Sequence, residues 1–177
     1  PDRHGLRPRD DMNVTARRAA PRQSTAPYER HMDKPAFEPS LKGRALRLLS
    51  QREHSRLELE RKLAPHETEP GQLAKALDEL QARGFISEER VVESVIHRRA
   101  AKLGTARVKQ ELQAKGLSPE AMGEALEQLR STELERAREV WARKFGEPAT
   151  EPKEKARQIR FMVSRGFAAE VVRKVVG

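Results

Sequence analysis

The amino-acid sequence predicts an all-α protein built from three tandem three-helix repeats. The first observation is an internal period. When residues 55–80 are shifted forward by 49 positions, their apolar residues fall on apolar residues without a gap, so that Leu59 meets Val108 and Leu77 meets Leu126. A fainter third copy follows about 50 residues later. The second observation is that the best helix-forming residues are abundant while only 4% of residues are aromatic. Periods of this size are typical of stacked units that cannot bury their apolar faces alone.

The apolar pattern divides the chain into an N-terminal arm, 1–40, and three repeats, 41–86, 87–131 and 132–177. The arm is rich in Pro, Arg and Asp and has few aliphatic side chains, so it cannot bury enough apolar surface to offset its ordering entropy. We therefore predict a disordered basic arm. Its arginines either contact an anionic partner or are simply solvated, and the composition favours a solvated tail.

Each repeat contains three runs of apolar residues at helical spacing. In the first repeat these runs are Leu41, Ala45, Leu46 and Leu49, then Leu59 and Leu63, then Leu73, Ala76, Leu77 and Leu80. In the second they are Val91, Val92, Val95 and Ile96, then Val108 and Leu112, then Met122, Ala125, Leu126 and Leu129. In the third they are Leu134, Ala137, Val140 and Trp141, then Ala156, Ile159, Met162 and Val163, then Val171, Val172, Val175 and Val176. The pattern predicts nine short helices.

The ends of the predicted helices have recognisable signals. Glycines that suit a left-handed C′ residue lie at Gly84, Gly116 and Gly166. Each is followed by an apolar residue and preceded four positions earlier by another, the pattern of a Schellman ending. N-cap signals are present at Ser87 and at Ser118–Pro119. In the first repeat Glu67 occupies the position of Gly116, so the turn through 64–66 must be built differently.

The residues that carry most enzyme chemistry are missing. There is no cysteine, which excludes disulfides and thiolate metal sites and is compatible with a reducing cytoplasm, where we expect the protein to be located. No apolar run is long enough for a membrane span. The five histidines are scattered, and carboxylates such as Glu58 are interleaved with cations such as Arg61 and Lys62, as on a solvated helix surface. We therefore predict a non-enzymatic protein with no catalytic residues, no metal site and no cofactor.

Basic residues offer the one candidate site. The chain carries a net charge of +9, and the third repeat has the largest excess, with 11 basic and 7 acidic groups. Basic clusters recur at similar places in the second and third repeats and would form a stripe suited to DNA phosphates or to a long acidic groove. The alternative, an ordinary solvated face, deserves equal weight. Stacking aromatics and base-reading side chains are absent from suitable positions, so sequence-specific readout is not expected.

Several segments resemble the RecX family, the bacterial regulators of the RecA recombinase. The resemblance runs from about Arg44 to Val176 and rests on the run from Leu48 to Arg56, on 84–90, on Gly104 with 107–108, and on Arg165-Gly166-Phe167. Two departures concern local packing or turn geometry. Family members often have an aromatic residue followed by alanine at 91–92, where this chain has two valines, and a glycine at position 67.

The resemblance implies an elongated, curved array of three helical repeats without catalytic activity. Such proteins lodge in the helical groove of the RecA–DNA filament, suppress ATP hydrolysis and strand exchange, and promote disassembly. Some also bind DNA directly. The expected partners are therefore the RecA filament and single- or double-stranded DNA, without a membrane, and we expect a monomer. The alternatives are a sequence-nonspecific DNA-binding protein that competes for DNA, and a scaffold that binds an unrelated peptide.

The candidate contact residues come from the second and third repeats. They are Arg98, Lys102, Arg107, Lys109, Lys144, Lys153, Arg157, Arg160 and Arg165. Their predicted role is charge complementarity to acidic filament surface or to DNA phosphate.

Overall fold

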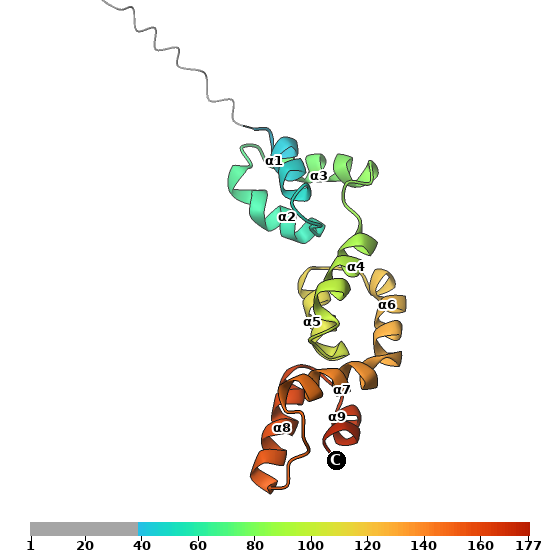
Figure 1. Ribbon diagram of the computed structural model, residues 1–177. Helices are drawn as coiled ribbons and strands as arrows, with labels where there is room; N and C mark the ends of the chain where they lie inside the picture. Colours follow the sequence, from blue (N-terminus) through green and yellow to red (C-terminus); the bar gives the residue numbers. More distant parts are fainter. Residues whose placement is uncertain (1–38) are drawn as a thin grey trace, which may run out of the picture. The chain divides into compact units, whose positions relative to one another are not determined.

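The computed structural model describes residues 39–177, and all regular secondary structure in this range is helical (Figure 1). The first three-helix unit contains α1 (Leu41–Leu49), α2 (Arg56–Leu63), the short 3₁₀ helix η1 (Ala64–His66) and α3 (Gln72–Ala82). The second contains α4 (Glu88–Arg99), α5 (Thr105–Ala114) and α6 (Pro119–Ser131). The third contains α7 (Glu133–Lys144), α8 (Pro152–Ser164) and α9 (Ala169–Val176). The predicted all-α fold of three-helix units is confirmed, whereas the predicted arm lies outside the described residues except for positions 39 and 40.

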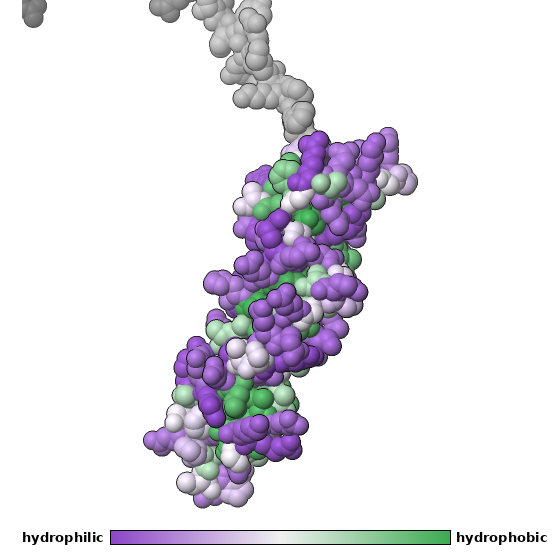
Figure 2. Space-filling model, turned by 90° about the vertical axis from the view of Figure 1, so that its right-hand side faces the viewer, coloured by the Kyte–Doolittle hydropathy of each residue, from purple (hydrophilic) through white to green (hydrophobic). Residues whose placement is uncertain are grey.

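Each unit has its own small hydrophobic core. Leu59, Leu77 and Leu80 are fully buried in the first unit, Val108 and Leu112 are buried in the second, and the third unit has a separate cluster. The third cluster consists of Ala137, Val140, Met162, Phe167, Val172 and Val176. On the face shown in Figure 2, hydrophobic residues form narrow strips between hydrophilic ones. Thin cores of this kind require the units to be joined by specific contacts.

The three predicted glycine endings are confirmed. Gly84, Gly116 and Gly166 have φ values of 74°, 72° and 85°. In each case the N–H of the glycine and the N–H of the next residue donate to carbonyls of the last helical turn, as in a Schellman motif. Leu117 and Phe167 are buried after their glycines, but Phe85 is 46% exposed and the core of the first unit takes Ile86 instead. The predicted apolar contact of Phe85 is therefore not made in the same way.

The predicted helix starts are also confirmed, and the first unit shows how a turn without glycine is built. Ser87 and Ser118 accept hydrogen bonds from the third helical N–H of α4 and α6. After α2 the chain passes through the 3₁₀ helix, and the Glu67 carboxylate then accepts a hydrogen bond of 3.0 Å from the N–H of Leu73. Glu67 thus stabilises the first turn of α3, whose N-cap, Gly71, has no capping side chain.

The second and third units are joined backbone to backbone. Gly104 N–H donates to the carbonyl of Arg165 at 2.9 Å, and Ala106 N–H donates to the carbonyl of Gly166 at 3.2 Å. A Cβ on Gly104 would overlap the carbonyl group of Gly166, and a Cβ on Gly166 would lie 2.5 Å from Cβ of Arg107. Neither glycine can therefore be replaced without separating α5 from the turn after α8.

This close approach makes a stability prediction with an internal control. Gly104→Ala should destabilise the protein by roughly 1–3 kcal/mol, because the added methyl overlaps backbone that cannot move freely. Gly123→Ala should stabilise it by about 0.5–1 kcal/mol, because Gly123 is inside α6 with no atom near a new Cβ. Urea unfolding followed by circular dichroism measures both changes. Equal stabilities for the two variants would contradict the backbone contact.

Candidate functional site: a basic cleft

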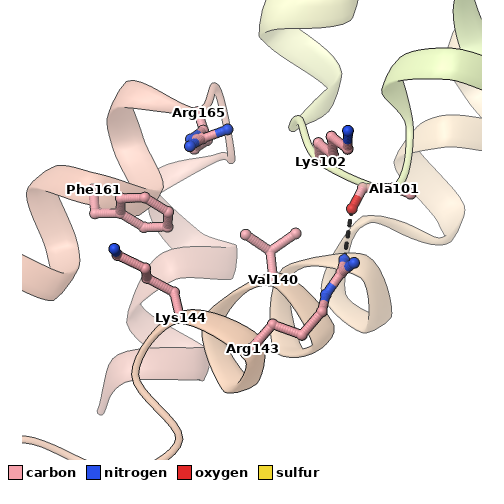
Figure 3. A pocket seen from close by; sticks show the side chains of 7 residues that line it. All are labelled: Ala101, Lys102, Val140, Arg143, Lys144, Phe161 and Arg165. Atoms are coloured by element: carbon pink, nitrogen blue, oxygen red, sulfur yellow. Dashed lines mark hydrogen bonds between the residues drawn. The ribbon is translucent and has the colours of Figure 1, made fainter. Parts of the chain in front are cut away.

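A basic cleft lies where the α4–α5 connection meets α7 and the end of α8 (Figure 3). Its volume is about 230 Å³. The side chains that line it are Ala101, Lys102, Val140, Arg143, Lys144, Phe161 and Arg165. Three of these, Lys102, Lys144 and Arg165, are among the nine predicted contact residues. The fold thus brings together cations from three segments that are far apart in the sequence.

The connection that carries Lys102 is held in place by two charged residues of α7, Glu133 and Arg136. The Glu133 carboxylate is buried and accepts a hydrogen bond of 2.9 Å from the N–H of Thr105. The Arg136 guanidinium donates to the carbonyls of Ala100 and Leu103, at 2.9 and 2.7 Å, and also to Leu129. Burial lowers the pKa of Arg136, and the nearby Glu133 charge opposes this. Because these bonds satisfy backbone carbonyls, the connection is fixed against α7.

Arg143 extends the same attachment to the edge of the cleft. Its Nη2 donates to the carbonyl of Ala101 at 2.7 Å, the hydrogen bond drawn in Figure 3. Arg143 was not among the nine predicted residues. A signal for it exists in the sequence, because Arg136, Val140 and Arg143 follow the i, i+4, i+7 spacing of one helix face. That face of α7 is the one directed at the second unit.

The aromatic ring of Phe161 lines the cleft, and two cations already lie against it. The Arg165 guanidinium carbon lies 4.9 Å from the ring centroid, and the Lys144 ammonium lies 5.9 Å from it. The Phe145 ring meets Phe161 edge to face at 5.3 Å. Cation–π contacts of this kind contribute about 0.5–1 kcal/mol at exposed sites and hold the charged groups in position. The ring is therefore not free to stack on a nucleobase.

The cations of the cleft have no carboxylate partner in the described part of the chain. Among residues 39–177, Lys102, Arg143, Lys144 and Arg165 form no ion pair within 4.0 Å, and no Asp or Glu lines the cleft. Four positive groups around one small cavity repel one another unless an anion binds between them. The electrostatics of the cleft therefore favour an anionic ligand.

The remaining predicted residues are exposed and lie outside the lining of the cleft. Arg98 donates to the carbonyl of Ser94, and Arg107 donates to the side-chain oxygen of Gln110. The others are Lys109 on α5 and Lys153, Arg157 and Arg160 on α8. Arg157 also forms an exposed ion pair of 3.2 Å with Glu154. The binding role of all nine residues stays a prediction.

The contact between the first and second units is different, because its charges are paired. Glu58 lies between Lys115, at 2.7 Å, and Arg52, at 3.0 Å, and Arg90 pairs with Glu53 at 2.9 Å. Burial raises the pKa of Glu58, but hydrogen bonds from Arg52, Lys115 and the Ser55 backbone outweigh it and lower that pKa to about 2. The side chain of Glu58 is only 17% exposed. The interpretation of Glu58 as part of a solvated surface with Arg61 and Lys62 was therefore wrong.

The described residues show two further absences. No group of three or more His, Cys, Asp or Glu side chains in residues 39–177 is placed to hold a metal ion. No helix in this range has the length and apolar character needed to cross a membrane.

Comparison with known proteins assigns the family. Sequence models of the first, second and third three-helix domains of RecX match residues 42–80, 87–126 and 131–176. The chain belongs to the RecX family. This confirms the resemblance seen in the sequence.

Named relatives agree with the assignment to RecX. A protein of Leptothrix cholodnii named regulatory protein RecX is 58% identical over 77% of this chain and 87% of its own length. A protein of Ralstonia nicotianae with the same name is 49% identical over 77% of this chain and 86% of its own. The crystal structure of RecX from Lactobacillus salivarius matches with a TM-score of 0.64 at 17% identity, covering 77% of this chain and 92% of that one. This last match concerns the fold alone.

The paired contact between the first two units should make stability depend on acid pH. Because the pKa of Glu58 is lower in the folded protein than the ordinary value of 4.5, its contribution is present above pH 4.5 and is lost as the pH falls toward 2. Glu58→Gln should therefore lower the unfolding temperature at pH 7 by several degrees and much less at pH 2.5.

Thermal unfolding at pH 7, 4 and 2.5 tests this difference, with Glu120→Gln as the control, because Glu120 is an exposed glutamate of α6. An equal effect of Glu58→Gln at every pH would contradict the role assigned to its charge.

Proposed function

We propose that this protein is a non-enzymatic regulator that binds the RecA–DNA filament, in its helical groove, and inhibits ATP hydrolysis and strand exchange or promotes disassembly of the filament. The observation that carries the proposal is the match of all three three-helix domains to RecX, together with relatives named regulatory protein RecX at up to 58% identity. In a protein of tandem repeats, each domain offers a contact at a fixed interval, an arrangement suited to a polymer of identical subunits.

The charge distribution supports a partner with an acidic or phosphate-rich surface. Within residues 39–177 the cations of the basic cleft have no carboxylate partner, and α8 presents Lys153, Arg157 and Arg160 to solvent. Exposed cations of this kind speed association with an anionic polymer and make binding depend on salt. A monomer in the cytoplasm, where RecA filaments assemble, is the form we propose.

A second candidate function is nonspecific DNA binding that limits RecA only by competing for DNA. The observation that favours it is the set of cations around the basic cleft, because DNA carries a dense array of negative charge that suits such a surface. Stoichiometry separates the two functions. A filament regulator acts when DNA is in large excess, whereas a competitor must occupy DNA sites.

The test is ATP hydrolysis by preformed RecA filaments on excess single-stranded DNA, titrated with this protein. Loss of turnover at protein concentrations well below those of RecA protomers and DNA sites is the result we expect. Inhibition only after the DNA is saturated would favour the competing DNA-binding protein. No effect at any ratio would overturn both functions.

A charge reversal on α8 tests whether its exposed face contacts the filament. Arg157→Glu with Arg160→Glu should raise the concentration needed for half-inhibition at least tenfold, because two attractions become repulsions. The helix content and unfolding temperature should hardly change, since the side chain of Arg157 is 64% exposed and its ion pair with Glu154 is worth at most about 1 kcal/mol.

The matched control is Lys62→Glu with Lys75→Glu, which changes the net charge equally on exposed positions of the first unit. Equal inhibition by the unmodified protein and the α8 variant would remove Arg157 and Arg160 from the interface. An equal loss in both variants would mean that net charge alone controls binding.

A further inference from the structure

The second unit has a groove between α4 and α6 whose charges are opposite to those of the basic cleft. The floor of this groove is apolar, with Val92 buried and Ile96 half-buried. Its volume is about 310 Å³. The residues that line this acidic groove are Glu89, Val92, Glu93, Ile96, Ala121, Glu124, Ala125 and Gln128. An apolar floor between carboxylates suits a surface that combines cations, with their aliphatic stems, and an apolar side chain.

The three carboxylates of the acidic groove are not used in ion pairs inside the protein. In the described part of the chain, Glu89, Glu93 and Glu124 have no cation within 4.0 Å. Glu89 accepts a hydrogen bond from the Ser87 hydroxyl, and Glu124 accepts one from the side-chain amide of Gln128. All three glutamates are exposed, so negative charge remains on both walls of the groove. These charges favour a cationic occupant.

The equivalent places in the other two units do not have this combination. In the first unit, Lys42 of α1 and Glu79 of α3 form an ion pair of 2.8 Å between the corresponding helices. In the third unit, the α9 positions that correspond to the alanines of the groove hold Val171 and Val175, which pack on the core of that unit. The groove of the second unit therefore stays open because its α6 has small residues and no ion pair crosses it.

A surface that complements the acidic groove lies on α8 of the same protein. Lys153, Arg157 and Arg160 follow the i, i+4, i+7 spacing of one helix face, and all three are exposed. Val163, three positions after Arg160, is 52% exposed and is one of two large apolar side chains with such exposure among the described residues. This basic face of α8 combines cations with an apolar side chain, as the groove combines carboxylates with an apolar floor.

We propose that the acidic groove of one molecule binds the basic face of α8 of a second copy of this chain. Because both surfaces are exposed in the molecule, they do not meet within it, and the contact joins two molecules. The two surfaces differ, so each bound pair leaves one groove and one α8 free for further copies. Since the contact is small and depends on exposed charges, its Kd at low salt should be on the order of 10–100 μM.

The contact has a consequence for inhibition that rests on the proposed function. A molecule whose α8 is bound to a neighbouring copy cannot present Arg157 and Arg160 to the RecA filament. Self-association and filament binding therefore compete for the same helix face. The monomer is the inhibiting form, and the self-associated protein is inactive until dilution or an anionic partner releases α8.

Sedimentation velocity of the full chain tests the self-association. At about 50 mM salt, the weight-average sedimentation coefficient should rise with protein concentration between about 5 and 200 μM, and this rise should disappear at about 500 mM salt because the charges are then screened over a few Å. A sedimentation coefficient that is independent of concentration at low salt would overturn the proposal.

Charge exchange tests which surfaces meet. Glu93→Lys with Glu124→Lys reverses the groove, Arg157→Glu with Arg160→Glu reverses α8, and each double variant should sediment as a monomer at every concentration. The fourfold variant brings opposite charges together again. Its changes of +4 and −4 cancel, so it keeps the net charge of +9 and should self-associate like the unmodified protein. A monomeric fourfold variant with unchanged helix content by circular dichroism would overturn the pairing of these two surfaces.

The matched control is Glu135→Lys with Glu139→Lys, which reverses two exposed glutamates of α7 outside the groove. It changes the net charge as much as the groove variant does and should keep the rise of the sedimentation coefficient with concentration. Equal loss of association in the control and the groove variant would mean that net charge alone controls it, and would overturn the assignment to the groove.

Inhibition of RecA hydrolysis separates this contact from the proposed function. At submicromolar concentrations the protein is monomeric, so the groove variant should inhibit as well as the unmodified protein. Loss of inhibition in the groove variant would make the filament the occupant of the groove and overturn the contact between copies, while the proposed function would stand. Self-association as expected without any inhibition of RecA would support the contact and overturn the proposed function.

Discussion

The backbone contact between the start of α5 and the end of α8 is the constraint on which the second and third units depend. Helices of 8–13 residues are marginal by themselves, and each of the three cores is small. The first N–H groups of a helix and its last carbonyls lack partners within the helix. Here Gly104 and Ala106 donate to the carbonyls of Arg165 and Gly166, so that one contact satisfies groups of both kinds. It requires glycine at 104 and at 166, and it positions the Arg165 side chain beside the α4–α5 connection.

The two contacts between successive units are held together by different interactions. The first relies on side-chain charge, because Glu58 is nearly buried between Arg52 and Lys115. The second relies on backbone hydrogen bonds and on half-buried Arg136, whose guanidinium donates to carbonyls of the α4–α5 connection and of α6. Since Arg136, Arg143 and the two glycines hold the units together, the side-chain charges of Lys102, Lys144 and Arg165 are not needed for that purpose. They are free to carry a like charge that would weaken a contact built from ion pairs.

The sequence was sufficient to predict the features that depend on neighbours along the chain. Apolar spacing, the caps at Ser87 and Ser118 and the left-handed glycines are local, and all of them appear in the structure. The cleft is not local, because Lys102, Lys144 and Arg165 come together only when the turn after α8 packs on α5. Glu58 was misjudged for the same reason. Its helical neighbours at i+3 and i+4 are basic, but its actual partners are Arg52, which precedes the helix, and Lys115, 57 positions away. The exposure of Phe85 likewise depends on how Ile86 enters the core.

Equivalent positions of successive repeats can therefore have different roles while the fold stays the same. Lys102 and Arg107 lie 49 positions after Glu53 and Glu58, and the same cations in the first contact would face Lys115 and Arg90. Arg90 also donates to the carbonyls of Gly84 and Phe85, but the first contact has no backbone-to-backbone hydrogen bonds among residues 39–177 like those of Gly104 and Ala106. In the second contact cations at these positions are tolerated, because the backbone hydrogen bonds of Gly104 and Ala106 hold the two units together. A cluster of unpaired like charges is compatible with a stable contact only where other interactions hold the units together. That condition is met between the second and third units, where the backbone hydrogen bonds of Gly104 and Ala106 lie beside the basic cleft.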